Sequence, residues 1–324
     1  MTEETLPVAR RAAVSSSRVL RRPRLSPLER REALQGLLFI SPWIIGFLVF
    51  TFLPMVAALA FSFTNIEITG GDPLRFVGLE NYQKLLIDPD VFNALKVTFV
   101  FAAIYLPITI AVPFFVAVLL NSPRLRGSSL FRVLIFLPYV VPVVAGILIW
   151  QSMLLADTGW VNQFLRAIGW SNPPDWLQDP TWIYPGMVIV SIWTIGSAVI
   201  VNIAGLNGVP TELYDAAKID GAGSWAQMRH ITLPMVSPVI FYSLTLGVVG
   251  VLQFFLVPFI LKSGTGEPGG TTMFYNLYIY KNFFTFQHMA YGATLAWLLF
   301  LITLVITVAL FASARRWVYY ASER

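Results

Sequence analysis

Six long stretches without charge constrain this chain more than any other feature of its sequence. Each runs for 24 residues or more without Asp, Glu, Lys or Arg. A helix needs about 20 predominantly apolar residues to cross the hydrocarbon core of a bilayer. The chain is therefore predicted to be an all-α integral membrane protein with six transmembrane helices, near residues 37–63, 97–120, 133–153, 183–204, 238–261 and 289–313.

The composition excludes a water-soluble domain. Charged residues make up 12% of the chain, whereas soluble domains carry about 25%. We expect one transmembrane domain (residues 36–314) between an Arg-rich N-terminal tail (1–35) and a short C-terminal tail (315–324). Clustered arginines without apolar periodicity predict that the N-terminal tail is disordered. Prolines within the spans predict bent helices, at Pro54, Pro107, Pro113, Pro138, Pro142 and Pro258.

The distribution of basic residues predicts the orientation. With the N-terminus inside the cell, 16 of the 22 Lys and Arg residues lie on inner segments and 6 on outer ones. An excess of Lys and Arg marks the cytoplasmic side. We therefore expect a plasma (inner) membrane protein of a bacterium or archaeon with both termini in the cytoplasm. This topology and contact with anionic membrane lipids explain the net charge of +5 without a nucleic-acid partner.

The sequence offers no set of residues suited to catalysis. It has no cysteine, and its two histidines, His230 and His288, lie far apart in the chain. We expect no metal site, no catalytic residues and no cofactor bound by this chain. No phosphate-binding P-loop sequence occurs. Residues 264–269 spell G-x-G-x-x-G but follow an apolar span and contain Pro268, which predicts a turn-rich outer loop instead.

The predicted spans lack ionisable residues near their centres. Carriers that couple transport to protons or ions bury such residues at membrane depth. A secondary carrier that couples through side-chain ionisation is therefore disfavoured. The energy for transport must come from a partner, or the chain is a passive channel.

The inner connection between the fourth and fifth spans, residues 206–237, carries the strongest local signals. Thr211 is a candidate N-cap for a short helix over residues 212–220. Gly221 follows, at the position where helices commonly end in the left-handed conformation.

A second short helix is predicted directly afterwards. Ser224 and Gln227 spell a capping box, and Pro234 marks the end of that helix or a kink in it. Two short helices joined by residues 221–223 would form a compact cytoplasmic protrusion. From these residues alone, a docking element and an interfacial cap on the helix bundle are both open.

This connection resembles a known sequence motif. It matches the E-A-A-x-x-x-G-x9-I-x-L-P loop of ABC importer permeases in spacing throughout. Asp215 stands where that family usually has Glu, and it is shorter by one methylene. The matching residues are Asp215, Ala216, Ala217, Gly221, Ile231, Leu233 and Pro234.

Further stretches resemble the carbohydrate-uptake branch of the family, and within it the maltose- and glycerol-3-phosphate-type first permease. They lie in the first outer loop, in and after the third span, and before the last span. They are Leu79-Glu80-Asn81-Tyr82 with Asp88-Pro89; Phe131-Arg132 with Phe136-Leu137-Pro138, Pro142, Trp150, Gly159 and Asn162; and Tyr278-Ile279-Tyr280 with Phe283 and Tyr291-Gly292.

The resemblance implies an ABC importer of type I architecture. It implies a second homologous permease subunit, two copies of an ABC ATPase and an extracytoplasmic solute-binding protein as partners. ATP and Mg would be bound by the ATPase. The loop residues that match the motif would contact that ATPase, and the chain itself would not be an enzyme.

The resemblance also implies that the cargo is a sugar or oligosaccharide. Glycerol-3-phosphate or another non-sugar solute is the alternative. The candidate pathway residues are polar or aromatic side chains at membrane depth, with bonding between helices as their competing role. They are Trp193, Thr194, Ser197, Asn202, Gln253 and Phe254. A self-sufficient channel or carrier is the competing function from a different class.

Overall fold

The computed structural model describes residues 26–69, 73–123 and 125–319. Within these ranges the chain is helical, and its β-structure is limited to one isolated bridge between Thr64 and Phe76. Two compact units are present, residues 1–55 and 56–324. The second unit contains the sites discussed below.

The first membrane helix begins earlier than the sequence analysis predicts. α1 (Pro27–Phe47), a π-helical turn (Leu48–Phe52) and α2 (Leu53–Ser62) form one apolar segment of 36 residues. The Ser26 backbone N–H donates to Glu29 Oε2 (2.7 Å), and the Glu29 N–H donates to Ser26 Oγ (3.2 Å). This capping box starts the helix inside the tail that we predicted to be disordered. That prediction is wrong for residues 27–35, and residues 1–25 lie outside the described ranges.

Four of the predicted spans are long apolar helices in the described part of the chain. These are the first segment, α4 (Pro89–Leu120), the helix over Ser224–Leu252 and α15 (Met289–Trp317). The C-terminal tail predicted from residue 315 therefore begins inside α15.

The other two predicted spans are sharply bent pairs of helices. α5 (Ser128–Val140) and α6 (Val143–Met153) meet at 98°, and α8 (Ile183–Ile192) and α9 (Gly196–Asn207) meet at 61°. The first bend falls at Val141, which is extended (φ −68°, ψ 133°) because Pro142 follows it. The chain thus has up to six spans if each bent pair is one span.

The fifth span differs from its prediction at both ends. α11 (Ser224–Gln227), a π-helical turn (Met228–Thr232) and α12 (Leu233–Leu252) are continuous. The helix continues through Pro234 and does not end there. The π-helical turn precedes this proline, which lies in the first turn of α12, where a proline is tolerated. At the other end, residues 253–255 break the predicted span 238–261 before α13 (Leu256–Lys262).

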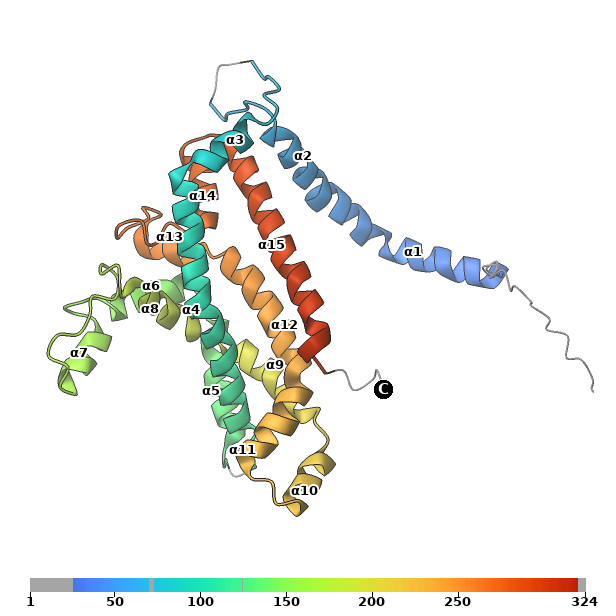
Figure 1. The fold of residues 1–324 in the computed structure, drawn as a ribbon, viewed down its shortest axis with the longest axis vertical. Coiled ribbons are helices and arrows are strands. Elements are labelled where there is room, and N and C mark those ends of the chain that lie inside the picture. Colours follow the sequence, from blue (N-terminus) through green and yellow to red (C-terminus); the bar gives the residue numbers. More distant parts are fainter. Residues whose placement is uncertain (1–25, 70–72, 124, 320–324) are drawn as a thin grey trace, which may run out of the picture. The chain divides into compact units, whose positions relative to one another are not determined.

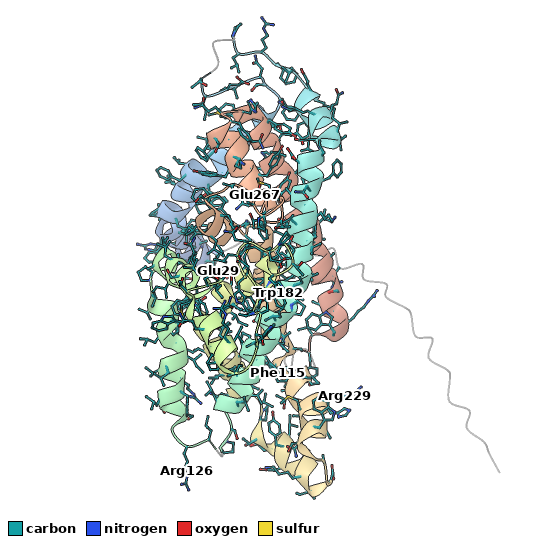
Figure 2. The ribbon with its side chains drawn as sticks, turned by 90° about the vertical axis from the view of Figure 1, so that its left-hand side faces the viewer. Glu29, Phe115, Arg126, Trp182, Arg229 and Glu267 are labelled. Carbon is teal, nitrogen blue, oxygen red and sulfur yellow. The ribbon has the colours of Figure 1, made fainter. Side chains whose placement is uncertain are left out.

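The 56–324 unit is built around α4, α9, α12 and α15, which pack side by side (Figure 1). α3 (Glu80–Ile87) lies at one end of this bundle and α10 (Thr211–Ile219) at the other. Arg126 and Arg229 lie toward the end that carries α10, whereas Glu267 lies toward the other end (Figure 2). The remaining outer segments include α7 (Trp160–Ala167) and α14 (Tyr275–Tyr280).

One carboxylate joins the helices α3, α4, α14 and α15. Asp88 Oδ2 accepts hydrogen bonds from the hydroxyls of Tyr278 (2.7 Å) and Tyr291 (2.6 Å). Asp88 Oδ1 accepts from the Asp90 N–H (2.9 Å) and caps α4. The Lys84 ammonium lies 4.4 Å from the centre of the Tyr291 ring. We call these four residues, Lys84, Asp88, Tyr278 and Tyr291, the outer clamp.

The outer clamp shifts the pKa values of Asp88 and Tyr278. Burial alone would raise the pKa of Asp88, but the hydrogen bonds from the two tyrosines and the backbone outweigh it, so the pKa lies below its ordinary value. Burial and the hydrogen bond to this carboxylate raise the pKa of Tyr278. Asp88 is therefore ionised and Tyr278 protonated at neutral pH.

Candidate functional sites: the inner elbow and the membrane cavity

The predicted inner protrusion is present as a short helix with a tight C-terminal turn. We call residues 210–227 the elbow. α10 begins at Thr211, but its N-cap is Pro210 and no side chain caps it, so the predicted cap by Thr211 is wrong. Glu212 in its first turn and Lys218 in its last suit the helix dipole.

The left-handed glycine was predicted correctly. Gly221 has φ +79°. Its N–H donates to Lys218 O (3.0 Å), and the Ala222 N–H donates to Ala217 O (2.8 Å). These two bonds form a Schellman motif, which satisfies the last carbonyls of α10 and turns the chain sharply.

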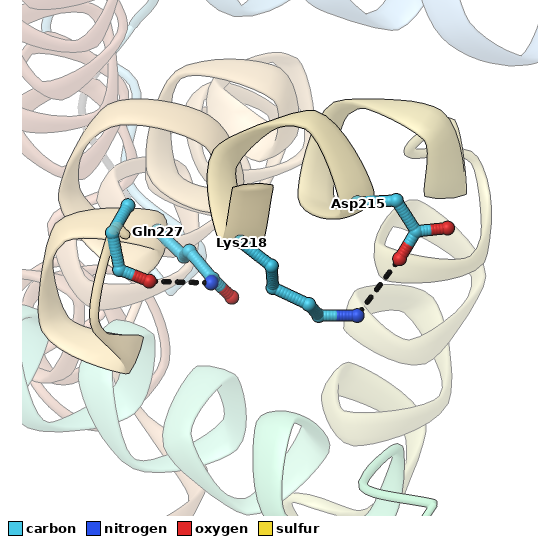
Figure 3. Close-up of polar contacts among 4 residues, drawn as sticks. Asp215, Lys218 and Gln227 are labelled. Carbon is cyan, nitrogen blue, oxygen red and sulfur yellow. Dashed lines mark hydrogen bonds and ion pairs between the residues drawn. The ribbon is translucent and has the colours of Figure 1, made fainter. Parts of the chain in front are cut away.

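The predicted capping box at Ser224 is absent. Gly223 is the N-cap of α11, and Ser224 is its first helical residue. The Gln227 side chain instead donates through Nε2 to Ala222 O at 2.8 Å (Figure 3). This bond holds the turn of the elbow against the base of the long helix.

The far side of the elbow is fixed to the bundle. The hydroxyls of Tyr214 and Thr232 lie 2.9 Å apart in a hydrogen bond. Ile231 and Leu233 pack against a buried cluster that includes Val236. These contacts make α10 and the base of α12 one connected element.

The residues that match the importer motif fall into two groups. Asp215, Ala216 and Gly221 are exposed and Ala217 is half-buried. Ile231, Leu233 and Pro234 are half-buried at the base of α12 and lie among bundle residues. The structure thus separates an accessible tip from an anchored base.

Asp215 has a partner within the elbow. Its Oδ1 lies 2.8 Å from Lys218 Nζ (Figure 3), and the two side chains are 68% and 63% exposed. An exposed ion pair contributes about 0–1 kcal/mol. Asp215 can therefore leave Lys218 at little cost when another cation approaches.

Two apolar side chains on the elbow escaped the sequence analysis. Ile219 is 87% exposed and Trp225 is 72% exposed. They are the two most exposed large apolar side chains of the elbow, and Leu213 on α10 is 42% exposed. The signal was available, since an Ile and a Trp in a short polar loop have no core to fill there.

A cavity of about 420 Å³ lies between α4, α8, α9 and α12. Its volume falls in the range of small-molecule sites, about 300–1,000 Å³. Its described lining residues carry hydroxyls, aromatic rings and small or apolar groups, and none carries a charge. They are Tyr105, Thr109, Ser191, Thr194, Ile195, Ser197, Ala198, Val201, Tyr242, Ser243, Leu246, Gly247, Gly250, Val251 and Phe254.

Three of the predicted pathway residues line this cavity and three do not. Thr194, Ser197 and Phe254 are in its wall. Gln253 lies outside this lining, next to the break in the helix, and its carbonyl accepts from Asn276 Nδ2 (3.0 Å).

Trp193 and Asn202 fill gaps between helices instead. The Trp193 ring packs edge-on against Trp150 (6.0 Å between centroids). It also lies so close to Gly146 that a Cβ added to this glycine would be 2.8 Å from the ring. Asn202 is 3% exposed and donates to Ala198 O (2.8 Å). Trp193 thus packs between helices, whereas the hydrogen bond of Asn202 stays within α9 and is not the interhelical bond considered in the sequence analysis.

The sequence analysis missed five polar lining residues, Tyr105, Thr109, Ser191, Tyr242 and Ser243. One signal for part of this wall was present. Positions 243, 247, 250 and 254 follow helical spacing and carry Ser, Gly, Gly and Phe, all in the lining. Tyr105 and Thr109 come from α4, a span that the analysis did not consider for cargo.

Aromatic rings form one wall of the cavity. Phe254 stacks on Phe101 (4.8 Å) and lies 5.9 Å from Tyr105, which also stacks on Phe101 (5.1 Å). The hydroxyls of Ser197, Tyr242 and Ser243 have no hydrogen-bond partner among residues 26–69, 73–123 and 125–319. The cavity lining therefore contains both aromatic rings and hydroxyls without a partner among the described residues, a surface suited to an uncharged polyhydroxyl compound.

The described residues thus place an uncharged cavity between apolar helices and a folded element at one end of them. Residues 110–321 match the family of binding-protein-dependent transport system inner membrane components. The chain belongs to this family, which confirms the predicted resemblance.

Relatives align along nearly the whole chain. The lactose transport system permease protein LacF of Rhizobium radiobacter is 36% identical over 294 residues, covering 90% of this chain and 97% of that protein. The trehalose/maltose transport system permease protein MalF of Thermococcus litoralis is 30% identical, covering 87% and 94%.

The fold agrees with a solved structure. A chain of a bacterial ABC transporter involved in the import of the acidic polysaccharide alginate superposes with a TM-score of 0.76 at 24% identity, covering 89% of this chain and 96% of that chain. The described part of this chain has the fold of an ABC importer permease.

Proposed function

We propose that this chain is a membrane subunit of an ATP-driven, binding-protein-dependent importer of a sugar or oligosaccharide. It forms half of the translocation pathway, and a second homologous permease forms the other half. Two copies of an ABC ATPase bind ATP and Mg on the cytoplasmic side, and a solute-binding protein delivers the cargo from outside. Both termini and the elbow face the cytoplasm.

The exposed tip of the elbow is the observation that carries this proposal. Asp215, Ala216 and Gly221 present little bulk, and Ile219 beside them presents an apolar contact. Small side chains let another backbone approach closely, and buried apolar side chains anchor protein interfaces. The tip is suited to insertion into a cleft of the ATPase.

The anchored base supports force transmission. Movement of the tip is carried through the Tyr214–Thr232 hydrogen bond and the packing of Ile231 and Leu233 to α12. α12 contributes Tyr242, Ser243 and Gly247 to the cavity wall. Closure of the ATPases therefore moves a wall of the cavity.

The cavity favours a neutral sugar over glycerol-3-phosphate. A phosphate ester needs cations or aligned N–H donors, and the described cavity lining carries no Lys or Arg. Relatives named for lactose and for trehalose/maltose transport support the same cargo class.

Reconstitution tests the proposal. In vesicles holding both permeases, the ATPase and the binding protein, we expect uptake of neutral oligosaccharide that requires ATP. Omitting the ATPase should abolish uptake. Solute movement by this chain alone would establish a self-sufficient channel and refute the proposal, whereas ATP-driven uptake of glycerol-3-phosphate only would refute the cargo assignment alone.

A further inference from the structure

A groove of about 910 Å³ lies along the last turns of α15, at the end of the bundle that carries the elbow. Thr307, Val308, Phe311, Ala312 and Arg315 form one stripe of this helix and line the groove. Their spacing of three to four residues is that of one helix face. The groove is separate from the membrane cavity and has no part in the function proposed above.

The walls of the groove are fixed by packing between α12 and α15. Phe241, which is 6% exposed, forms the opposite wall and contacts the Phe311 ring edge-on (5.1 Å). The Trp317 ring lies 5.8 Å from Phe241. Beyond α15, the Tyr319 N–H donates to Ser237 Oγ (2.9 Å) and ties the chain back to α12.

The groove has an apolar length and a basic mouth. Val308 is 60% exposed and Phe311 is 55% exposed, so apolar surface lines its open side. Arg315 stands where the uncharged run of α15 ends, followed by Trp317. Arg and Trp at the end of an apolar helix mark the membrane interface.

The depth of the groove matches one leaflet. From residue 307 to residue 318 a helix rises about 16 Å, which is about half of a hydrocarbon core of about 30 Å. The groove therefore starts at headgroup level and follows the acyl chains of a single leaflet.

The mouth carries unpaired positive charge. Arg315 and Arg316 are exposed, and neither makes an ion pair within the described ranges. The occupant that fits needs an apolar chain about one leaflet long and a negative head.

We propose that this groove binds an anionic phospholipid of the leaflet on the elbow side. Its phosphate pairs with Arg315, and an acyl chain lies along Val308, Phe311 and Ala312 against Phe241. The proposal concerns Arg315 specifically, because Arg316 is not part of the groove lining. Arg315 and the groove thus form a specific binding site, which differs from the general attraction of basic residues to a negatively charged membrane surface.

Native mass spectrometry of the assembled transporter tests this proposal. After equilibration in vesicles of phosphatidylglycerol and phosphatidylcholine, we expect retained phosphatidylglycerol on the wild type. Arg315→Gln should lower its retention about fivefold, the fold-change of about 1 kcal/mol per basic residue near a charged surface. Arg316→Gln, with the same change of charge one residue away, should retain wild-type amounts.

A third variant separates the groove from the charge. Ala312→Trp fills the groove without changing charge and should lose the retained phosphatidylglycerol, while its gel-filtration profile stays that of the assembled complex. Equal losses in Arg315→Gln and Arg316→Gln would overturn the proposal in favour of unspecific attraction. Full retention by Ala312→Trp would overturn it in favour of another occupant.

Discussion

Removing one hydrogen bond of the outer clamp should destabilise the chain measurably. Tyr278→Phe deletes only the hydroxyl that donates to Asp88 Oδ2 at 2.7 Å. Tyr278 is 7% exposed, so water does not readily replace the bond. A hydrogen bond to a charged group contributes about 1.5–3 kcal/mol. With an unfolding entropy of about 2.1 cal/mol/K per residue, the 324-residue chain should shift by about 1.5 °C per kcal/mol, so the unfolding midpoint should fall by about 2–5 °C.

The assay is thermal unfolding of the full chain in detergent at pH 7, followed by tryptophan fluorescence. Tyr139→Phe is the matched control, because Tyr139 is 53% exposed and its hydroxyl has no partner in the described part of the chain. It should leave the midpoint unchanged. Equal midpoints for Tyr278→Phe and the wild type would refute the reasoning that Asp88 holds α14 and α15 to α4.

The pH dependence of the clamp has a definite sign. The pKa of Asp88 is lowered in the folded chain, so its contribution is present above the unfolded pKa of about 3.9 and is lost as pH falls through the folded value. The pKa of Tyr278 is raised, so its contribution is lost as pH rises above about 10. Asp88→Asn should therefore be less stable than the wild type between pH 5 and 9 (roughly), and the difference should narrow in acid.

Three further predictions concern the elbow and the cavity. Gly221→Ala strains a residue at φ +79° by about 1–2 kcal/mol and should reduce coupled uptake in reconstituted vesicles. Gly223→Ala, at φ −70° with open space around it, should leave that uptake unchanged. Ile219→Asp should weaken ATPase binding by about fivefold or more, the effect of an interface anchor worth over 1 kcal/mol, measured by pull-down against Glu212→Gln as an exposed control. Gly250→Leu extends into open space at the cavity and should block uptake while ATP hydrolysis persists. Gly36→Leu, also in open space but not in the cavity lining, should transport normally.

Apolar run length predicted the membrane segments but not their ends. Hydropathy measures how long a segment can stay in lipid, and helices continue beyond it wherever caps and helix formers allow. α1 begins at Pro27 because Ser26 and Glu29 cap it, a local signal inside a charged region. Conversely, the break at residues 253–255 lies within an apolar run, because tertiary packing of α13 against α6 and α8 opposes the local preference.

Local signals predicted the elbow better than they predicted the cavity. Gly221 reports a backbone conformation that few other residues adopt, so one residue fixes the turn. Neither Thr211 nor Ser224 caps its helix, because a residue type that can cap a helix does not have to do so. The cavity joins residues from α4, α8, α9 and α12, and which polar groups face one another depends on the bends of 98° and 61°. Pro142 marks the first bend in the sequence, whereas residues 193–195 at the second bend contain no proline.

Cross-linking from the elbow tests the coupling role most directly. The chain has no cysteine, so Ala216→Cys is a unique thiol on an exposed position of α10. In the assembled transporter we expect it to cross-link to the ATPase subunit and to change its yield when ATP is added, while Trp160→Cys on the α7 segment (73% exposed) does not. Absence of any ATPase adduct from Ala216→Cys, or its modification by an impermeant thiol reagent from outside intact cells, would contradict the account.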